Sequence, residues 1–137
     1  MENIFALPPS PTEASRPFWE GCNDKKLLLQ FCRSCDRLFY YARRNCPHCG
    51  GGDLQWRAAR GSGTVWSYTH VEVSFYGSQW ESQIPYTSLL VDLDEGVRML
   101  SRLVGAGRAD VEIGARLCVN FVRIDSQMFP YFKLVKA

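Results

Sequence analysis

Apolar and polar residues alternate in short runs along the second half of the chain, a pattern typical of half-buried β-strands. The longest run, 64–74, places Val65 and Val71 on one face and Trp66 and His70 on the other. Five strands are predicted, at 64–74, 85–92, 97–104, 116–124 and 131–135. Asp94, Glu95 and Gly96 predict a tight hairpin between the second and third. Because no long helix interrupts these strands and the first is the longest, we expect a five-stranded OB-fold barrel.

The first half of the chain carries shorter extended runs, at 27–31, 38–41 and 54–57, which predict a small hairpin module. A short helix is expected near 16–23, where Pro17 suits the first turn. Three prolines within residues 1–15 predict a flexible or partner-bound arm. The expected fold is therefore mainly β, with an arm and short helix at 1–24, a rubredoxin-like ribbon at 25–60 and the barrel at 61–137.

Four of the six cysteines form two Cys-x2-Cys pairs, Cys32 with Cys35 and Cys46 with Cys49. Two such knuckles facing one another supply the four thiolates of a closed, tetrahedral zinc site. Two disulfides, unliganded thiols or an iron centre are the alternatives. Four protein ligands leave no position for water or substrate, so the expected Zn²⁺ is structural.

The remaining metal-binding and thiol side chains have less specific interpretations. His48 lies between two ligands and is expected to be solvent-exposed, since four cysteines complete the sphere. Cys22 and Cys118 lie outside the pairs and are expected to be packing residues.

Composition and targeting signals narrow the class of protein. Among the 137 residues, 46% are hydrophobic, which excludes wholesale disorder, and the longest apolar runs are too short to cross a bilayer. The N-terminus lacks the basic start and continuous apolar stretch of a secretory signal. We therefore expect a soluble cytoplasmic protein whose thiols stay reduced.

Charge is unevenly distributed although the net charge is only +2. Between residues 33 and 60, six arginines stand against two aspartates, whereas the barrel carries seven basic and eight acidic residues. Arg43 and Arg44 are therefore candidates for holding phosphates or an acidic partner surface, with a simply solvated face as the alternative.

Aromatic residues occupy the two connections that would flank the binding face of an OB-fold. The first, 75–83, contains Phe75, Tyr76 and Trp80, and the second, 125–130, contains Phe129. Exposed apolar clusters mark contacts, so these side chains are expected to touch a partner or ligand, unless they are lids over the barrel ends.

No catalytic constellation is apparent. The chain has two histidines and no nucleophile elbow or phosphate loop, and the acidic turn at 92–95 is expected to be a solvated hairpin. His70 is a possible general base without an identifiable partner. Independent turnover is not expected.

These motifs, taken in order, resemble the zinc-ribbon/OB-fold proteins associated with acyl-CoA metabolism. The resemblance covers nearly the whole chain and rests on 17–20 (Pro-Phe-Trp-Glu), the two cysteine pairs, the joint at 61–65, Pro85-Tyr86, the turn at 92–96 and Ile113-Gly114. Tyr41-Ala42-Arg43 departs from the Pro-Pro-Arg run of many relatives.

The resemblance implies a non-catalytic accessory subunit bound to a thiolase-like, acyltransferase or other acyl-CoA-processing partner. It also implies that Phe18 and Trp19, in the helical segment, help to dock the partner, and that ribbon or barrel residues lie near the coenzyme A thioester. The alternative is an OB-fold module for single-stranded nucleic acid, which the slightly acidic barrel disfavours.

Overall fold

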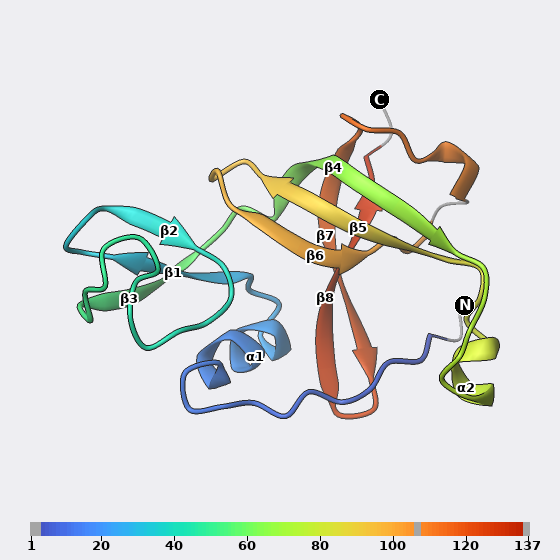
Figure 1. Cartoon of the computed structure of the whole chain (residues 1–137), viewed down its shortest axis with the longest axis horizontal. Helices are drawn as coiled ribbons and strands as arrows, with labels where there is room; N and C mark the ends of the chain where they lie inside the picture. The colour runs from blue at the N-terminus through green and yellow to red at the C-terminus, as the bar shows by residue number, and fades with distance from the viewer. Residues whose placement is uncertain (1–3, 106–107, 136–137) are drawn as a thin grey trace.

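The computed structural model describes residues 4–105 and 108–135. Figure 1 shows a small three-stranded sheet at one end of the long axis and a five-stranded barrel at the other, with helix α1 (Arg16–Asn23) below the junction. The expected fold class, mainly β with a ribbon followed by an OB-like barrel, is confirmed. No helix of the described residues is long and apolar enough to cross a membrane.

The small sheet consists of β1 (Leu28–Cys32), β2 (Arg37–Phe39) and β3 (Leu54–Ala58) in the antiparallel order β2-β1-β3. Each strand lies within two residues of its predicted position at both ends. The long connection from β2 to β3 contains the second cysteine pair, so both knuckles lie at the same end of this sheet.

The barrel consists of β4 (Ser62–Val71), β5 (Tyr86–Leu93), β6 (Arg98–Arg102), β7 (Arg116–Ile124) and β8 (Gln127–Leu134). Their order is β6-β5-β4-β7-β8, with antiparallel neighbours. A parallel bridge between Leu103 and Phe132, supported by a 2.8 Å hydrogen bond from Val104 N to Phe132 O, joins the two outer strands. This parallel closure completes the OB topology.

One hydrophobic core joins helix, ribbon and barrel. Phe18 and Cys22 of α1 and Leu29 of β1 pack in the same buried cluster as Leu89 and Phe132 of the barrel. The Cys22 prediction is confirmed, and burial raises the pKa of its thiol to about 12. Because this core is continuous, the ribbon is held in a fixed position relative to the barrel.

The N-terminal arm, residues 4–15, lies against the chain's own barrel. Phe5 N donates to Gln83 Oε1 at 2.8 Å, and Arg102 Nη1 donates to Phe5 O at 3.3 Å. Ala6 is buried. The arm is thus anchored at Phe5, where the sequence predicts a flexible or partner-bound segment.

Two further local features differ from the sequence prediction. A short helix, α2 (Ser78–Glu81), forms within the connection from β4 to β5. A β-bulge between Val65 and Ser67 turns Trp66 outward, where the guanidinium of Arg98 lies 3.7 Å from the centroid of its indole ring. The alternation expected along 64–74 is therefore wrong beyond Val65.

Candidate metal centre and contact surfaces

The four cysteines of the two knuckles converge. All Sγ atoms lie within 4.8 Å of one another, with Cys32 Sγ 3.5 Å from Cys49 Sγ and Cys35 Sγ 3.7 Å from Cys46 Sγ. A tetrahedral zinc with Zn–S bonds near 2.3 Å has sulfur–sulfur edges of about 3.8 Å, whereas a disulfide needs about 2.05 Å. The geometry fits one structural zinc and excludes the disulfide alternative in this structure.

Backbone amides of the second knuckle support this site. His48 N donates to Cys46 Sγ at 3.3 Å, and Gly51 N donates to Cys49 Sγ at 3.4 Å. Gly50 has φ +79°, a left-handed conformation that a side chain would strain. These donors spread the negative charge of thiolates and orient them toward a common centre.

The metal-free thiols differ in how easily they ionise. Burial opposes ionisation of Cys32, but hydrogen bonds from the Cys35 amide and the Cys49 thiol outweigh it and lower the pKa of Cys32 to about 7. Burial, followed by hydrogen bonds to the neighbouring thiols, raises the pKa of Cys35 to about 12. Ionisation of Cys32 is thus favoured over that of Cys35.

His48 is exposed, as predicted, and its Nδ1 lies 3.3 Å from Arg37 Nη1. It takes no part in the sulfur cluster, which contains only the four cysteines among the described residues. The knuckle tip is therefore a surface feature.

The connection from β2 to the second knuckle is fixed by a buried glutamine. Gln30 Nε2 donates to Arg43 O at 2.9 Å, and Arg43 N donates to Gln30 Oε1 at 2.7 Å. Arg43 is exposed, and of the six ribbon arginines it alone makes no side-chain interaction within the described residues. Arg44 is also exposed and lies 3.6 Å from Glu13 of the arm.

The aromatic connection after β4 is exposed at its start. Phe75 and Tyr76 are 86% and 83% exposed. Trp80 is half-buried because the Phe5 ring lies 5.1 Å from it and the Tyr86 ring lies 6.0 Å from it. Its indole therefore belongs to the wall that α2 forms against the arm.

The second aromatic connection does not exist as predicted. Only Asp125 and Ser126 separate β7 from β8, and Phe129 lies within β8, 7% exposed, with its ring 5.7 Å from that of Trp19. Placing Phe129 in an exposed loop is wrong, because its apolar surface is satisfied by α1. Phe18 is equally buried, and Trp19 is half-buried between the Phe18 and Phe129 rings.

The candidate contact residues fall into two separate groups. Arg43 and Arg44 belong to the ribbon, at one end of the long axis, whereas Phe75 and Tyr76 lie just before α2 at the other end (Figure 1). The short joint at 60–63 predicts from sequence that these arginines lie beside the aromatic loop, and this prediction is wrong. The joint between ribbon and barrel is short, but the ribbon strands and α2 lie at opposite ends of the long axis (Figure 1).

The acidic turn after β5 has a role that the sequence did not reveal. Asp94 Oδ1 and Oδ2 each accept from Arg116 at 2.9 Å, Asp94 Oδ2 accepts from Ser62 Oγ at 2.7 Å, and Glu95 Oε2 accepts from Arg60 N at 2.8 Å. The hydrogen bonds from Arg116 and Ser62 hold the pKa of Asp94 well below its usual range. This turn clamps the joint between ribbon and barrel.

His70 acquires a partner through the bulge in β4. His70 is opposite Thr87 and Val65 is opposite Val91, so both lie on the face that points into the barrel. His70 Nδ1 and the buried Thr87 Oγ1 are 2.8 Å apart. The hydroxyl orients the imidazole.

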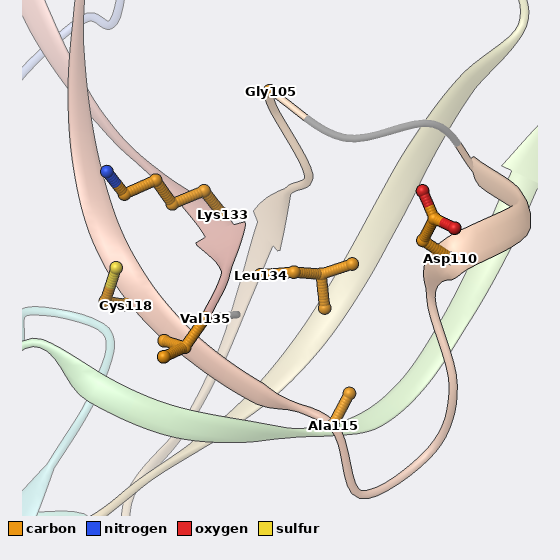
Figure 2. A pocket seen from close by; sticks show the side chains of 7 residues that line it. All are labelled: Gly105, Asp110, Ala115, Cys118, Lys133, Leu134 and Val135. Atoms are coloured by element: carbon orange, nitrogen blue, oxygen red, sulfur yellow. The ribbon is translucent and has the colours of Figure 1, made fainter. Parts of the chain in front are cut away.

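A surface hollow of about 720 Å³ lies where β7 begins and β8 ends. Cys118, Lys133 and Asp110 are among the residues that line it. Cys118 is half-buried at this surface, whereas Cys22 is fully buried in the core. In Figure 2, Cys118 and Lys133 lie on one side of the hollow and Asp110 on the other, with Leu134 between them. These groups do not converge on a common point.

Known family models match the chain in two consecutive stretches. Residues 19–55 match the rubredoxin-like zinc ribbon domain of ChsH2, and residues 56–122 match the C-terminal OB-fold domain of ChsH2. The first stretch contains all four candidate zinc ligands.

Curated relatives span two kinds of protein. A probable enoyl-CoA hydratase alpha subunit of Thermomonospora curvata is 32% identical over 131 residues, which are 93% of this chain but only 40% of that relative. A DUF35 domain-containing scaffold protein of Methanocaldococcus jannaschii is 30% identical over 77% of this chain and 75% of its own length. A scaffold protein with the same description, from Methanothermobacter thermautotrophicus, is 28% identical over 68% of this chain and 69% of its length.

Solved structures show the same fold. A chain of the structure titled Ltp2-ChsH2(DUF35) aldolase superposes with a TM-score of 0.83 and 27% identity, covering 93% of this chain and 98% of that one. A DUF35 protein of unknown function from Sulfolobus solfataricus superposes with a TM-score of 0.64 and 21% identity, covering 90% and 86%.

Proposed function

Because the chain belongs to the DUF35 family of ChsH2-like zinc-ribbon/OB-fold proteins, we propose that it is a non-catalytic accessory subunit of an acyl-CoA-processing enzyme. Family members are described as scaffold proteins or as parts of a hydratase or an aldolase. The catalytic partner is proposed to be a thiolase-like or acyltransferase-type subunit, which holds the reacting groups, and the complex is proposed to be cytoplasmic.

The observation that carries this proposal is the match to the Ltp2-ChsH2(DUF35) aldolase, in which nearly the whole matched chain corresponds to this one. A chain of this size and shape therefore occurs in an enzyme named for two components. The cysteine site supports a structural role, because four protein ligands close the zinc sphere to substrate.

Two exposed surfaces are proposed as contacts. At the ribbon end, Arg43 and Arg44 offer guanidinium groups to the phosphates of coenzyme A or to an acidic partner surface. At the barrel end, Phe75 and Tyr76 offer large exposed rings, which commonly become buried at protein interfaces. The half-buried Trp19 is proposed to contribute to docking at α1.

The test is co-expression of the tagged chain with a thiolase-like protein encoded by a neighbouring gene. We expect the two to copurify in a fixed ratio and to turn over an acyl-CoA only together. Turnover by the purified single chain at ordinary enzymatic rates contradicts the proposal. Tight binding of single-stranded DNA that weakens steeply with salt, without any effect of coenzyme A, favours a nucleic-acid module instead.

Variants separate the two contact surfaces. Arg43→Ala/Arg44→Ala is expected to raise the Michaelis constant for the acyl-CoA or to weaken the complex, and Phe75→Ala/Tyr76→Ala is expected to weaken the complex. Trp80→Ala removes the half-buried ring behind the aromatic loop and tests whether that wall contributes to complex formation. Arg33→Ala, in the same ribbon but paired with Asp53 at 3.9 Å, is the control for loss of positive charge. Zinc content shows that each variant is folded.

A further inference from the structure

An open hollow of about 470 Å³ lies at the barrel end that carries α2. Its lining comes from the arm, the end of β4, the connection through α2 and the start of β5. The lining residues are Leu7, Val71, Val73, Ser74, Tyr76, Gln79, Trp80 and Tyr86. Its volume lies within the range of about 300–1,000 Å³ typical of small-molecule sites.

The walls of this hollow are fixed by contacts within the chain. The arm is anchored by the hydrogen bond from Phe5 N to Gln83 Oε1, and Arg102 Nη2 donates to the same oxygen at 3.1 Å. Trp80 is held between the Phe5 and Tyr86 rings. The side of the hollow formed by Trp80 and Tyr86 is therefore preformed, whereas Leu7, Val73 and Tyr76 are largely exposed at its rim.

The chemistry of the lining selects the ligand. Six of the eight lining side chains are aliphatic or aromatic, and none is charged. Phosphate or carboxylate groups would lose hydration there without gaining a counter-charge, so the lining disfavours ionised groups inside the hollow. The two polar side chains differ in how they are engaged: Ser74 Oγ accepts from Tyr76 N at 3.3 Å and keeps its own proton for donation, and Gln79 adds an amide.

From this lining we infer that the hollow binds the apolar acyl group of a coenzyme A thioester, with Ser74 and Gln79 facing any oxygen that the acyl group carries. The inference rests on the proposed function and assigns the acyl group, as opposed to the nucleotide, to this chain. The nucleotide phosphates stay outside the hollow, since its lining offers no cation.

The test measures binding to the zinc-loaded full chain alone, because every wall of the hollow comes from this chain. Isothermal titration compares octanoyl-CoA with free coenzyme A, and we expect octanoyl-CoA to bind at least tenfold more tightly. Val73→Glu places a charge at the rim on a side chain that is 61% exposed, so the fold tolerates it. Ile113→Glu, at a 71% exposed position outside the hollow, is the matched control.

Support for the inference is a preference for octanoyl-CoA that Val73→Glu abolishes and Ile113→Glu retains. Equal binding of octanoyl-CoA and coenzyme A by the parent chain overturns it, as does a preference that survives in Val73→Glu. If the parent shows no preference and Val73→Glu loses the copurifying catalytic subunit, the hollow is a protein contact. Failure of the proposed function is distinguishable, because it appears as absence of any copurifying partner for the parent chain.

Discussion

Gln30 and Arg43 are joined by two hydrogen bonds between one side-chain amide and one backbone unit, of 2.9 and 2.7 Å. Gln30 lies in the central strand of the ribbon and is only 5% exposed, whereas Arg43 lies in the connection that leads to the second knuckle. The two residues are 13 positions apart in the sequence. The buried side-chain amide of Gln30 therefore fixes the backbone position from which the Arg43 guanidinium projects.

Gln30→Leu is expected to lower the free energy of unfolding by about 1–3 kcal/mol, because it leaves the Arg43 amide and carbonyl without their partner in a partly buried site. Urea denaturation measures this change. Gln79→Leu, the same substitution at an exposed position, should leave the free energy of unfolding nearly unchanged. Equal stability of Gln30→Leu and the parent would show that solvent replaces these bonds.

The zinc site is expected to bind one metal ion per chain. Cys35→Ser should lose the metal and unfold the ribbon, because structural zinc contributes on the order of 10 kcal/mol to such modules. Cys22→Ser and Cys118→Ser should keep the metal, since neither thiol belongs to the sulfur cluster. Elemental analysis of protein purified without chelator measures the stoichiometry, and a preparation without zinc or iron refutes the assignment.

The cysteine site could be predicted from the sequence because its information is local. The spacing within each pair sets a knuckle, and Gly50 permits the turn that follows the last ligand. Convergence of the two knuckles then needs β1 to pair with both β2 and β3, which places Leu54 opposite Cys32. The barrel strands were predictable for a similar reason, since alternation and turn residues are read within a few positions.

Features that depend on distant contacts could not be predicted. Phe129 is buried because Trp19, 110 residues earlier in the sequence, lies against it. Pro130 made the start of β8, the strand that contains Phe129 and Pro130, look like a loop. Asp94 carries no sequence signal that distinguishes it from a solvated turn residue, and only the approach of Arg116 and Ser62 gives it a role. The bulge at Trp66 similarly depends on how β4 pairs with β5.

Asp94 is expected to make stability depend on acid pH. Its carboxylate is stabilised by Arg116 and Ser62, so its pKa in the folded chain lies well below the ordinary value of 3.8. A lowered pKa stabilises the fold above about pH 4, and that contribution is lost as the pH falls through the folded-state pKa. Asp94→Asn should therefore be less stable than the parent at pH 7, with a difference that narrows from pH 4 towards pH 2.

Thermal unfolding between pH 2 and pH 7 measures this difference for Asp94→Asn. Asp110→Asn, at an exposed position, is the control and should follow the parent throughout. A constant difference between Asp94→Asn and the parent across this range would mean that the charge of Asp94 does not contribute.

Phe129 and Phe75 are expected to respond in opposite ways to the same substitution. Phe129→Ala removes a ring that is 7% exposed and packed against Trp19, which typically costs about 3–5 kcal/mol, because α1 loses its contact with β8 and a cavity remains. Phe75→Ala removes a ring that is 86% exposed, so the free energy of unfolding should change by less than about 0.5 kcal/mol. In copurification with the catalytic partner, Phe75→Ala should weaken the complex although its stability matches that of the parent. Urea denaturation and quantitative pull-down provide the two measurements. If Phe129→Ala is as stable as the parent, or if Phe75→Ala binds the partner unchanged, then the assignment of Phe129 to the core or of Phe75 to the interface fails.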